Sequence, residues 1–344
     1  MKVVYSDKHA QHDPSYFLVR GQRQKSAEQP ARADQLLAAA RAGGHTIVPP
    51  ASSGLAPVLA VHTPDYVDFL QVAQREWQKL DGAGAEVVPG AHPVRHGGTY
   101  PRSIVGRAGW HQVDGACPIG PGTWAAALAA SEVAVTAAQI VLDEAQAGAA
   151  RPMAYALCRP PGHHAYADLA GGFCFLNNTA IAAQHLRRQH DRVAILDVDV
   201  HHGNGTQGIF WRRNDVLTVS IHADPADYYP YFWGYAHERG EGAGEGCNLN
   251  LPLPVGTGDE AWLAAGEQAL ARIRAFAPTA LVVALGLDAS EHDPLKGMTI
   301  TTAGFGRMAA LIGTLGLPTV LVQEGGYLGP ELGENLAAVL AAIG

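Results

Sequence analysis

Residues 196–205 read LDVDVHHGNG and place carboxylates and imidazoles directly after an aliphatic run. In an extended segment, residues two apart point to the same side, so we expect Asp197, Asp199 and His201 along one face. Two carboxylates this close repel each other unless a cation lies near them. Carboxylates and imidazole together are a common ligand set for zinc or another divalent transition metal. The stretch therefore predicts a metal site rather than a strand end with helix-capping acids.

A third ligand is expected from Asp288, which lies in GLDASEHDP (286–294) after another aliphatic run. Three protein ligands leave one position for water or substrate, which is typical of catalytic metal sites. The set Asp199, His201 and Asp288 therefore predicts catalysis at the metal.

Two adjacent histidines, His163 and His164, follow a further aliphatic run. Neighbours on a turn point in different directions, so both rarely bind one metal, and we interpret them as proton-transfer groups beside it. Each needs a hydrogen-bond partner that fixes its tautomer, and Asp197 and Asn204 are the candidates. Tyr327 follows two glycines, whose conformational freedom would let it turn inward and donate a hydrogen bond to a developing oxyanion.

The elements that must position these residues alternate between strand and helix. Strands are expected at 2–6, 153–158, 193–198, 216–222, 280–286 and 318–324, and helices at 31–44, 63–77, 123–145, 178–188, 204–211, 259–276, 303–315 and 331–342. The strands are almost wholly aliphatic without alternation, as in strands covered on both faces, so a parallel sheet in an α/β fold is expected. Because we find no internal repeat or linker, residues 1–344 are interpreted as one domain.

Four polar clusters lie just past the carboxyl ends of these strands, where open α/β sheets build their sites. They are RPPGHHAYADLAGGF after 153–158, DVDVHHGNG after 193–196, GLDASEHDP after 280–285 and EGGY after 319–323. Four clusters in equivalent positions predict one composite site at that edge of the sheet.

Residues 78–122, called the long loop below, interrupt the alternation with ten glycines, five prolines and little apolar periodicity. A loop of this length inside a compact domain is usually functional. We interpret it as a rim, a lid or a subunit contact, with a tolerated surface insertion as the alternative.

Composition limits the function classes. Of 344 residues, 47% are hydrophobic and 16% charged, which suits a large buried core, and the net charge of -8 argues against a general nucleic-acid binder. The four cysteines show no CxxC spacing. The N-terminus lacks the apolar segment of a secretion signal, and no apolar run is expected to be long enough to span a bilayer. A cytoplasmic protein without a membrane or nucleic-acid partner is expected.

Five blocks together resemble the signature blocks of the histone deacetylase and acetylpolyamine amidohydrolase family, in the same order. They are RPPGHH (159–164), GGFCFLNN (171–178), ILDVDVHHGNGTQ (195–207), GLDASEHDP (286–294) and EGGY (324–327). The resemblance covers nearly the whole chain. It implies the arginase–deacetylase fold, with a parallel sheet of about eight strands between helical layers.

The resemblance also implies a role for each matching residue. Asp199, His201 and Asp288 match zinc ligands, with Fe²⁺ and Co²⁺ as alternative metals. His164 matches the general base and has Asn204 as its partner, while His163 matches the electrostatic partner of that base and is oriented by Asp197. Tyr327 matches the residue that polarises the scissile carbonyl. Phe173 and Tyr229 match the walls of an acyl-chain tunnel, Gly172 a carbonyl that accepts from the substrate amide, and Leu295 a rim position. Asp197 and Ser220, with main-chain oxygens near Phe210 and Val216, match structural potassium sites. Asn204 departs from the aspartate of many relatives.

Similarities of individual segments predict that the substrates are small acetylated amines, most of all acetylpolyamines. The N-terminus and residues 91–103, 120–128 and 224–248 are similar to bacterial acetylpolyamine amidohydrolases, in which the long loop helps to form a homodimer and narrows the tunnel mouth. Asp114 and Glu291 are candidates for binding the distal amine. Residues 288–305 are instead similar to class II deacetylases, so an acyl-lysine deacetylase is the main alternative. A two-metal arginase-like hydrolase and an inactive sensor of acylated ligands are the others.

Overall fold

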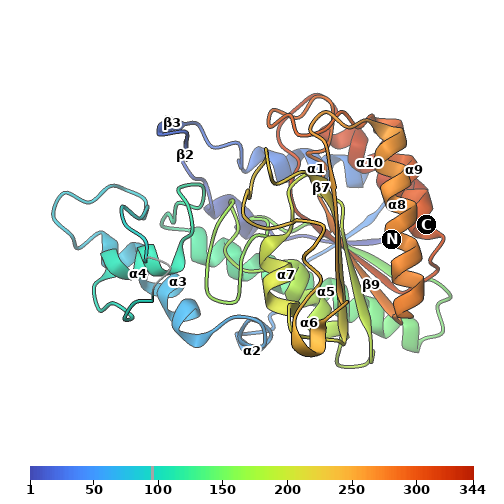
Figure 1. The fold of residues 1–344 in the computed structure, drawn as a ribbon, viewed down its shortest axis with the longest axis horizontal. Helices are drawn as coiled ribbons and strands as arrows, with labels where there is room; N and C mark the ends of the chain where they lie inside the picture. Colours follow the sequence, from blue (N-terminus) through green and yellow to red (C-terminus); the bar gives the residue numbers. More distant parts are fainter. Residues whose placement is uncertain (94–96) are drawn as a thin grey trace.

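An eight-stranded parallel sheet forms the centre of the molecule in the computed structural model, which describes residues 1–93 and 97–344 (Figure 1). Its strands are, in spatial order, β4 (Thr46–Val48), β1 (Lys2–Val4), β5 (Met153–Ala156), β10 (Thr319–Gln323), β9 (Ala280–Leu285), β6 (Val193–Asp197), β7 (Val216–Ala223) and β8 (Asn248–Leu253). All seven pairings are parallel. The carboxyl ends of all eight strands therefore lie at one edge.

The four strands that carry the polar clusters, β5, β10, β9 and β6, are consecutive in this order. Register aligns their ends, since Asp197 at the end of β6 is paired with Ala284 of β9 and with Ser220 of β7. Clusters spread over residues 159–327 of the chain are thus brought to one short stretch of the sheet edge.

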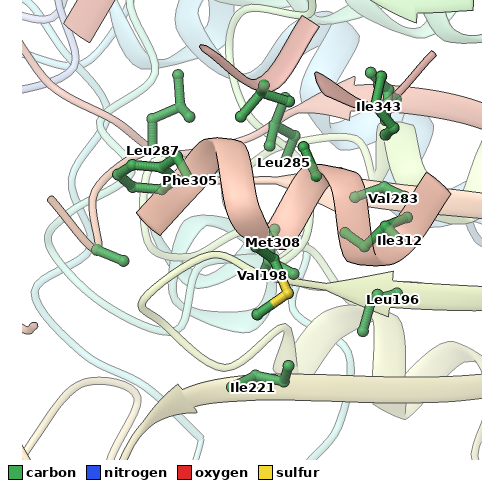
Figure 2. Packing of buried hydrophobic residues seen from close by; sticks show 14 of the residues in the cluster. Leu196, Val198, Ile221, Val283, Leu285, Leu287, Phe305, Met308, Ile312 and Ile343 are labelled. Atoms are coloured by element: carbon green, nitrogen blue, oxygen red, sulfur yellow. The ribbon is translucent and has the colours of Figure 1, made fainter. Parts of the chain in front are cut away.

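Helices cover both faces of the sheet. One face is covered by α1 (Ala31–Ala42), α8 (Asp259–Phe276), α9 (Thr302–Gly313) and α10 (Leu332–Ala342), and the other by α5 (Thr123–Gln146), α6 (Asn178–Leu186) and α7 (Asn204–Phe210). Figure 2 shows the packing on the first face, where Phe305, Met308 and Ile312 of α9 approach Val283 and Leu285 of β9. Apolar burial on both faces explains why the strands are aliphatic throughout.

The remaining elements gather at one side of the molecule, away from α8 and α9 (Figure 1). They are the hairpin of β2 (Phe17–Val19) and β3 (Gln22–Gln24), α2 (Ala56–Leu59), α3 (Pro64–Trp77) and α4 (Ile104–His111). Two short 3₁₀ helices, Asp7–Gln11 and Gly242–Gly244, are also present. A separate apolar cluster joins α3, α4 and the sequence after β5.

The six predicted strands and the parallel sheet are confirmed, but β4 and β8 were not predicted individually. Both are edge strands: β4 has only three residues, and β8 alternates asparagine with leucine and contains Pro252, which is tolerated at an edge. No helix or strand was predicted in the long loop, but it contains α4 and a backbone pairing of Val87 with Ile119. Residues 94–96 of that loop lie outside the described residues.

The expectation that no segment is long and apolar enough to span a bilayer was also wrong by length and composition. Helix α5 passes that test with a mean hydropathy of 1.7 over an 18-residue window. However, 72% of the window is buried against the rest of the protein. The apolar character of α5 is therefore accounted for by packing between the sheet and α6.

Candidate active site

Asp199, His201 and Asp288 converge at the carboxyl edge of β6 and β9. His201 Nδ1 lies 3.1 Å from Asp199 Oδ1 and 3.1 Å from Asp288 Oδ2. One ligand atom from each residue lies within 4.8 Å of the others, and all three residues are buried. The structure therefore brings together the three residues that the sequence predicted as ligands.

The donor set and the charge of these residues fit a divalent cation. A Cβ at Gly325 would collide with carboxylate oxygens of both Asp288 and Asp199, and the Gly325 N–H donates to Asp199 Oδ2 at 2.7 Å. In the described part of the chain, the ion pairs of both carboxylates involve only histidines and neither lysine nor arginine. Two buried carboxylates without a permanent cationic partner are costly, and a bound metal would remove that cost.

A second buried group, His163, Cys174 and Glu324, also has its donor atoms within 4.8 Å of one another. Its carboxylate is already committed to protein donors. Glu324 Oε2 accepts the N–H groups of Gly162 at 2.6 Å and His163 at 3.0 Å, and Oε1 accepts the hydroxyl of Thr179 at 2.6 Å. This group therefore fixes the backbone of the histidine loop, and we do not interpret it as a second metal site.

His163 and His164 lie with their rings 4.0 Å apart, and each has the partner expected for it. His163 Nδ1 lies 2.9 Å from Asp197 Oδ2, and His164 Nδ1 lies 2.7 Å from Asn204 Oδ1. Burial disfavours charge on His163, but Asp199 and Asp197 outweigh it and raise its pKa to about 10. Burial, reinforced by His163 and His201, holds the pKa of His164 well below its ordinary value. His164 is thus the neutral member of the pair at pH 7.

Tyr327 is placed by contacts to its backbone and to the turn before it. Gly326 has a φ of +104°, and the N–H of Tyr327 donates to Asp293 Oδ2 at 3.0 Å. Burial, followed by the negative charge of Asp288, holds the pKa of the Tyr327 hydroxyl well above its ordinary value. The group therefore stays protonated and can donate a hydrogen bond.

A buried charged network supports this turn from behind. Arg32 donates to the carbonyl oxygen of Glu324 at 2.6 Å, to that of Gly326, and to Glu28 Oε1 at 2.8 Å. Arg159, the first residue of RPPGHH, has its Nε 2.9 Å from the same Glu28 oxygen. Glu28 thus connects the N-terminal segment to both the histidine loop and the tyrosine turn.

A cavity of about 720 Å³ leads to these groups from the surface. Its inner end is lined by His164, His201 and Tyr327, and its walls include Gly172, Phe173, Tyr229 and Leu295. Phe173, Leu295, Phe17 and Tyr327 form one apolar cluster. The exposed aromatic residues Tyr231, Phe232 and Trp233 lie at the mouth. We call the passage between Phe173 and Tyr229 the tunnel.

The other predicted residues are placed as follows. Asp114 lines the cavity, whereas Glu291 is exposed and does not belong to its lining. Ser220 lies opposite Asp197 in the β6–β7 register, and its Oγ lies 2.7 Å from His222 Nδ1. Phe210 ends α7 and Val216 begins β7, so both border the same strand pair.

Sequence reasoning missed several residues that organise the site. Glu324 and Arg159 belong to blocks that were recognised, and a buried charge beside a glycine turn or a histidine pair was the available signal. Arg32 and Glu28 carried no local signal, because their side-chain partners are more than 130 residues away, apart from their mutual contact and His12, whose Nε2 lies 3.5 Å from Glu28 Oε2. Asp293 was inside EHDP but had no predicted role.

Comparison with known proteins gives consistent matches along the chain. A profile of the histone deacetylase domain matches residues 26–343. The acetylpolyamine amidohydrolase of Burkholderia pseudomallei is 45% identical over 333 residues, which cover 97% of this chain and 96% of that protein. Acetylpolyamine amidohydrolase 1 of Pseudomonas aeruginosa is 45% identical over 345 residues, with coverages of 99% and 98%. The crystal structure of the acetylpolyamine aminohydrolase from Burkholderia pseudomallei superimposes with a TM-score of 0.95 at 45% identity, covering 100% of this chain and 98% of that one.

Proposed function

Since the chain belongs to the histone deacetylase family, has its arginase–deacetylase fold and is a hydrolytic deacetylase, we propose that it removes acetyl groups from small acetylated amines, acetylpolyamines above all. The observation that carries the proposal is the buried set of Asp199, His201, Asp288, His164 and Tyr327 at the inner end of an apolar-walled cavity. The similarity to acetylpolyamine amidohydrolases over almost the full length supports the substrate class.

Asp199, His201 and Asp288 would hold one Zn²⁺ ion, with Fe²⁺ and Co²⁺ as alternatives. When bound, such an ion supplies Lewis-acid polarisation of the scissile carbonyl and lowers the pKa of water. Structural K⁺ is proposed near Asp197 and Ser220.

His164 is assigned the role of general base. Its Nδ1–H donates to Asn204 Oδ1, which leaves Nε2 with a free lone pair for the proton of the attacking water. His163, held in its charged form by Asp199 and Asp197, adds a positive field beside the developing negative charge. A protonated histidine of this pair then returns the proton to the leaving amine.

Tyr327 is assigned to the oxyanion that forms at the acetyl carbonyl. Its hydroxyl is protonated, and its backbone is held by Asp293 and by the turn at Gly326, so little reorganisation is needed during the reaction. The Phe173 ring lies 5.7 Å from the Tyr327 ring and keeps the reacting end of the tunnel apolar.

The walls favour a thin, extended amine. Phe173 and Tyr229 would strip water from an aliphatic chain, with Gly172 offering its carbonyl to the substrate amide. The aromatic faces of Tyr231 and Trp233 at the mouth would attract a distal ammonium by cation–π contact, and the net charge of -8 adds a favourable field. These features support acetylpolyamines over acetylated proteins.

The test is a panel of kcat/KM values for acetylputrescine, acetylcadaverine, acetylspermidine and acetyl-lysine peptides. We expect the acetylated diamines to be hydrolysed with the highest kcat/KM. Preference for the peptides would replace the proposal with an acyl-lysine deacetylase, a reading that the apolar Leu295 at the rim also favours.

We further propose that residues 1–344 act as one catalytic domain in a cytoplasmic homodimer. The support for a dimer is the apolar surface of the long loop, where Tyr100, Val105 and Val113 are 39%, 45% and 40% exposed. The Tyr100 ring also makes an edge contact with Trp110 at 5.7 Å. Aromatic anchors of this kind are enriched at interfaces.

A further inference from the structure

Asp114 lies in the long loop between α4 and α5, is partly buried and lines the cavity. An acid at this place would ordinarily be interpreted as a free counter-charge for a cationic substrate. Its hydrogen bonds indicate a different role.

A single carboxylate oxygen of Asp114 bonds to both sides of the tunnel. Oδ2 accepts the hydroxyl of Tyr229 at 2.7 Å and the backbone N–H of Gly172 at 3.2 Å. Oδ1 accepts the N–H of Ala116 at 2.8 Å, which fixes the carboxylate to its own loop. A carboxylate has about four lone-pair positions, so most of its hydrogen-bonding capacity is already used by protein.

Both groups held by Asp114 need an external support. Gly172 and Phe173 have φ values of +51° and +70°, and a non-glycine residue in this region is retained only when its surroundings impose it. On the other side, the Tyr229 ring lies edge-on to His164 with centroids 5.0 Å apart and 6.0 Å from the His201 ring. A Tyr229 side chain without its bond could move away from both imidazoles.

We propose that Asp114 is a positioning residue that sets the width of the tunnel by bridging its two walls, and that it thereby makes thin acetylated amines better substrates than acetylated peptides. The inference rests on the proposed function and deepens it. The long loop then contributes to specificity from within its own chain, through one carboxylate, whatever the oligomeric state.

The experiment compares Asp114→Ala, Asp114→Asn and Tyr229→Phe with the control Asp227→Asn, which removes the other cavity-lining acid. Three substrates separate width from charge: acetylputrescine (thin, cationic), N-butylacetamide (thin, neutral) and an acetyl-lysine peptide (wide). Asp114→Ala is expected to lower kcat/KM for both thin substrates by about 10- to 100-fold, with the peptide less affected, since misplacement near the reacting groups can cost about 10²-fold.

The conservative variants sharpen the result. Asp114→Asn keeps an oxygen that can accept hydrogen bonds from both walls. It should therefore recover most of the wild-type ratio of kcat/KM for the thin substrates to kcat/KM for the peptide. Asp227→Asn should leave the ratio of kcat/KM for the neutral N-butylacetamide to that for the peptide unchanged. A double-mutant cycle between Asp114→Ala and Tyr229→Phe should be non-additive, because the two variants break the same bridge. Loss of activity on acetylputrescine alone, with N-butylacetamide unaffected, would instead assign Asp114 to ammonium binding and overturn the proposal.

Hydrogen exchange at the Gly172 amide gives a readout independent of turnover. Exchange should accelerate in Asp114→Ala and stay slow in Asp227→Asn, at unchanged melting temperature. If the wild-type protein hydrolyses neither thin substrate, the proposed function fails, whereas unchanged Gly172 exchange in Asp114→Ala rejects the bridge itself.

Discussion

The backbone N–H of Tyr327 donates to Asp293 Oδ2 at 3.0 Å, while Oδ1 of the same carboxylate accepts the N–H of Leu295 at 2.8 Å. One buried acid therefore fixes both a reacting group and a wall of the cavity. Burial, followed by repulsion from Asp288, raises the pKa of Asp293 to about 7, so this position is retained at an electrostatic cost. Such a cost is understandable if the place of the Tyr327 hydroxyl matters for the reaction.

Tyr327→Phe should lower kcat by about 10²–10³ while the fold and the bound metal are retained. The hydroxyl is assigned to the transition state only, so kcat should fall much more than substrate affinity. Steady-state kinetics with metal analysis of the same preparation would check this. Tyr235→Phe, away from the inner end of the cavity, is the control; near-normal turnover in Tyr327→Phe would remove this tyrosine from the mechanism.

One divalent metal ion is expected per chain, and His201→Ala should lose metal and activity together. Elemental analysis after extensive dialysis measures this directly. A surface group of Glu291, His292 and Glu331 also has donor atoms within 4.8 Å of one another and could collect adventitious metal, so His292→Ala is the matched control. Two tightly held ions per chain in that control would favour the arginase-like alternative.

The metal-ligand residues could be predicted from the sequence more completely than the contacts that position them. Asp199 and His201 could be predicted because both lie within a few residues of a strand end, where period-two geometry fixes their side. That Asp288 joins them needed the strand order, since β6 and β9 are neighbours although 83 residues separate Asp197 from Ala280. Sequence patterns favour a parallel sheet but do not contain the order of its strands.

Contacts between segments that are far apart in the chain could not be predicted from the sequence. Asp114 had been a candidate for binding a free amine, and nothing local indicates that Tyr229, 115 residues away, donates to it. Likewise β8 lacks the aliphatic run of the central strands because its buried Asn248 and Asn250 donate hydrogen bonds to Gln207 and Glu238, so the pattern that identifies β6 or β9 is weak there.

The intact protein should be a dimer by light scattering, with the exposed side of α4 at the contact. Val105→Asp places a charge on a residue that is 45% exposed in one chain, so it should produce monomers without unfolding. Val255→Asp, 48% exposed and away from the long loop, is the control. A monomer for the unmodified protein would leave the long loop as a rim within one chain.

Glu28→Gln should destabilise the protein by about 3–5 kcal/mol at neutral pH, because it leaves the buried Arg32 and Arg159 without their carboxylate. Burial alone would raise the pKa of Glu28, but Arg159 and Arg32 outweigh it and hold the pKa below the ordinary value of 4.5. A lowered folded-state pKa means that the stabilisation is complete above pH 4.5 and is lost as pH falls through the folded value. The difference in unfolding free energy between wild type and Glu28→Gln should therefore be constant from pH 7 to 5 and shrink below pH 4.5, as measured by urea unfolding across that range.

The control is Glu260→Gln, which breaks an exposed pair with Arg307 and should change the unfolding free energy little at any pH. Equal stability of wild type and Glu28→Gln at pH 7 would show that the network fixes the tyrosine turn without stabilising the fold.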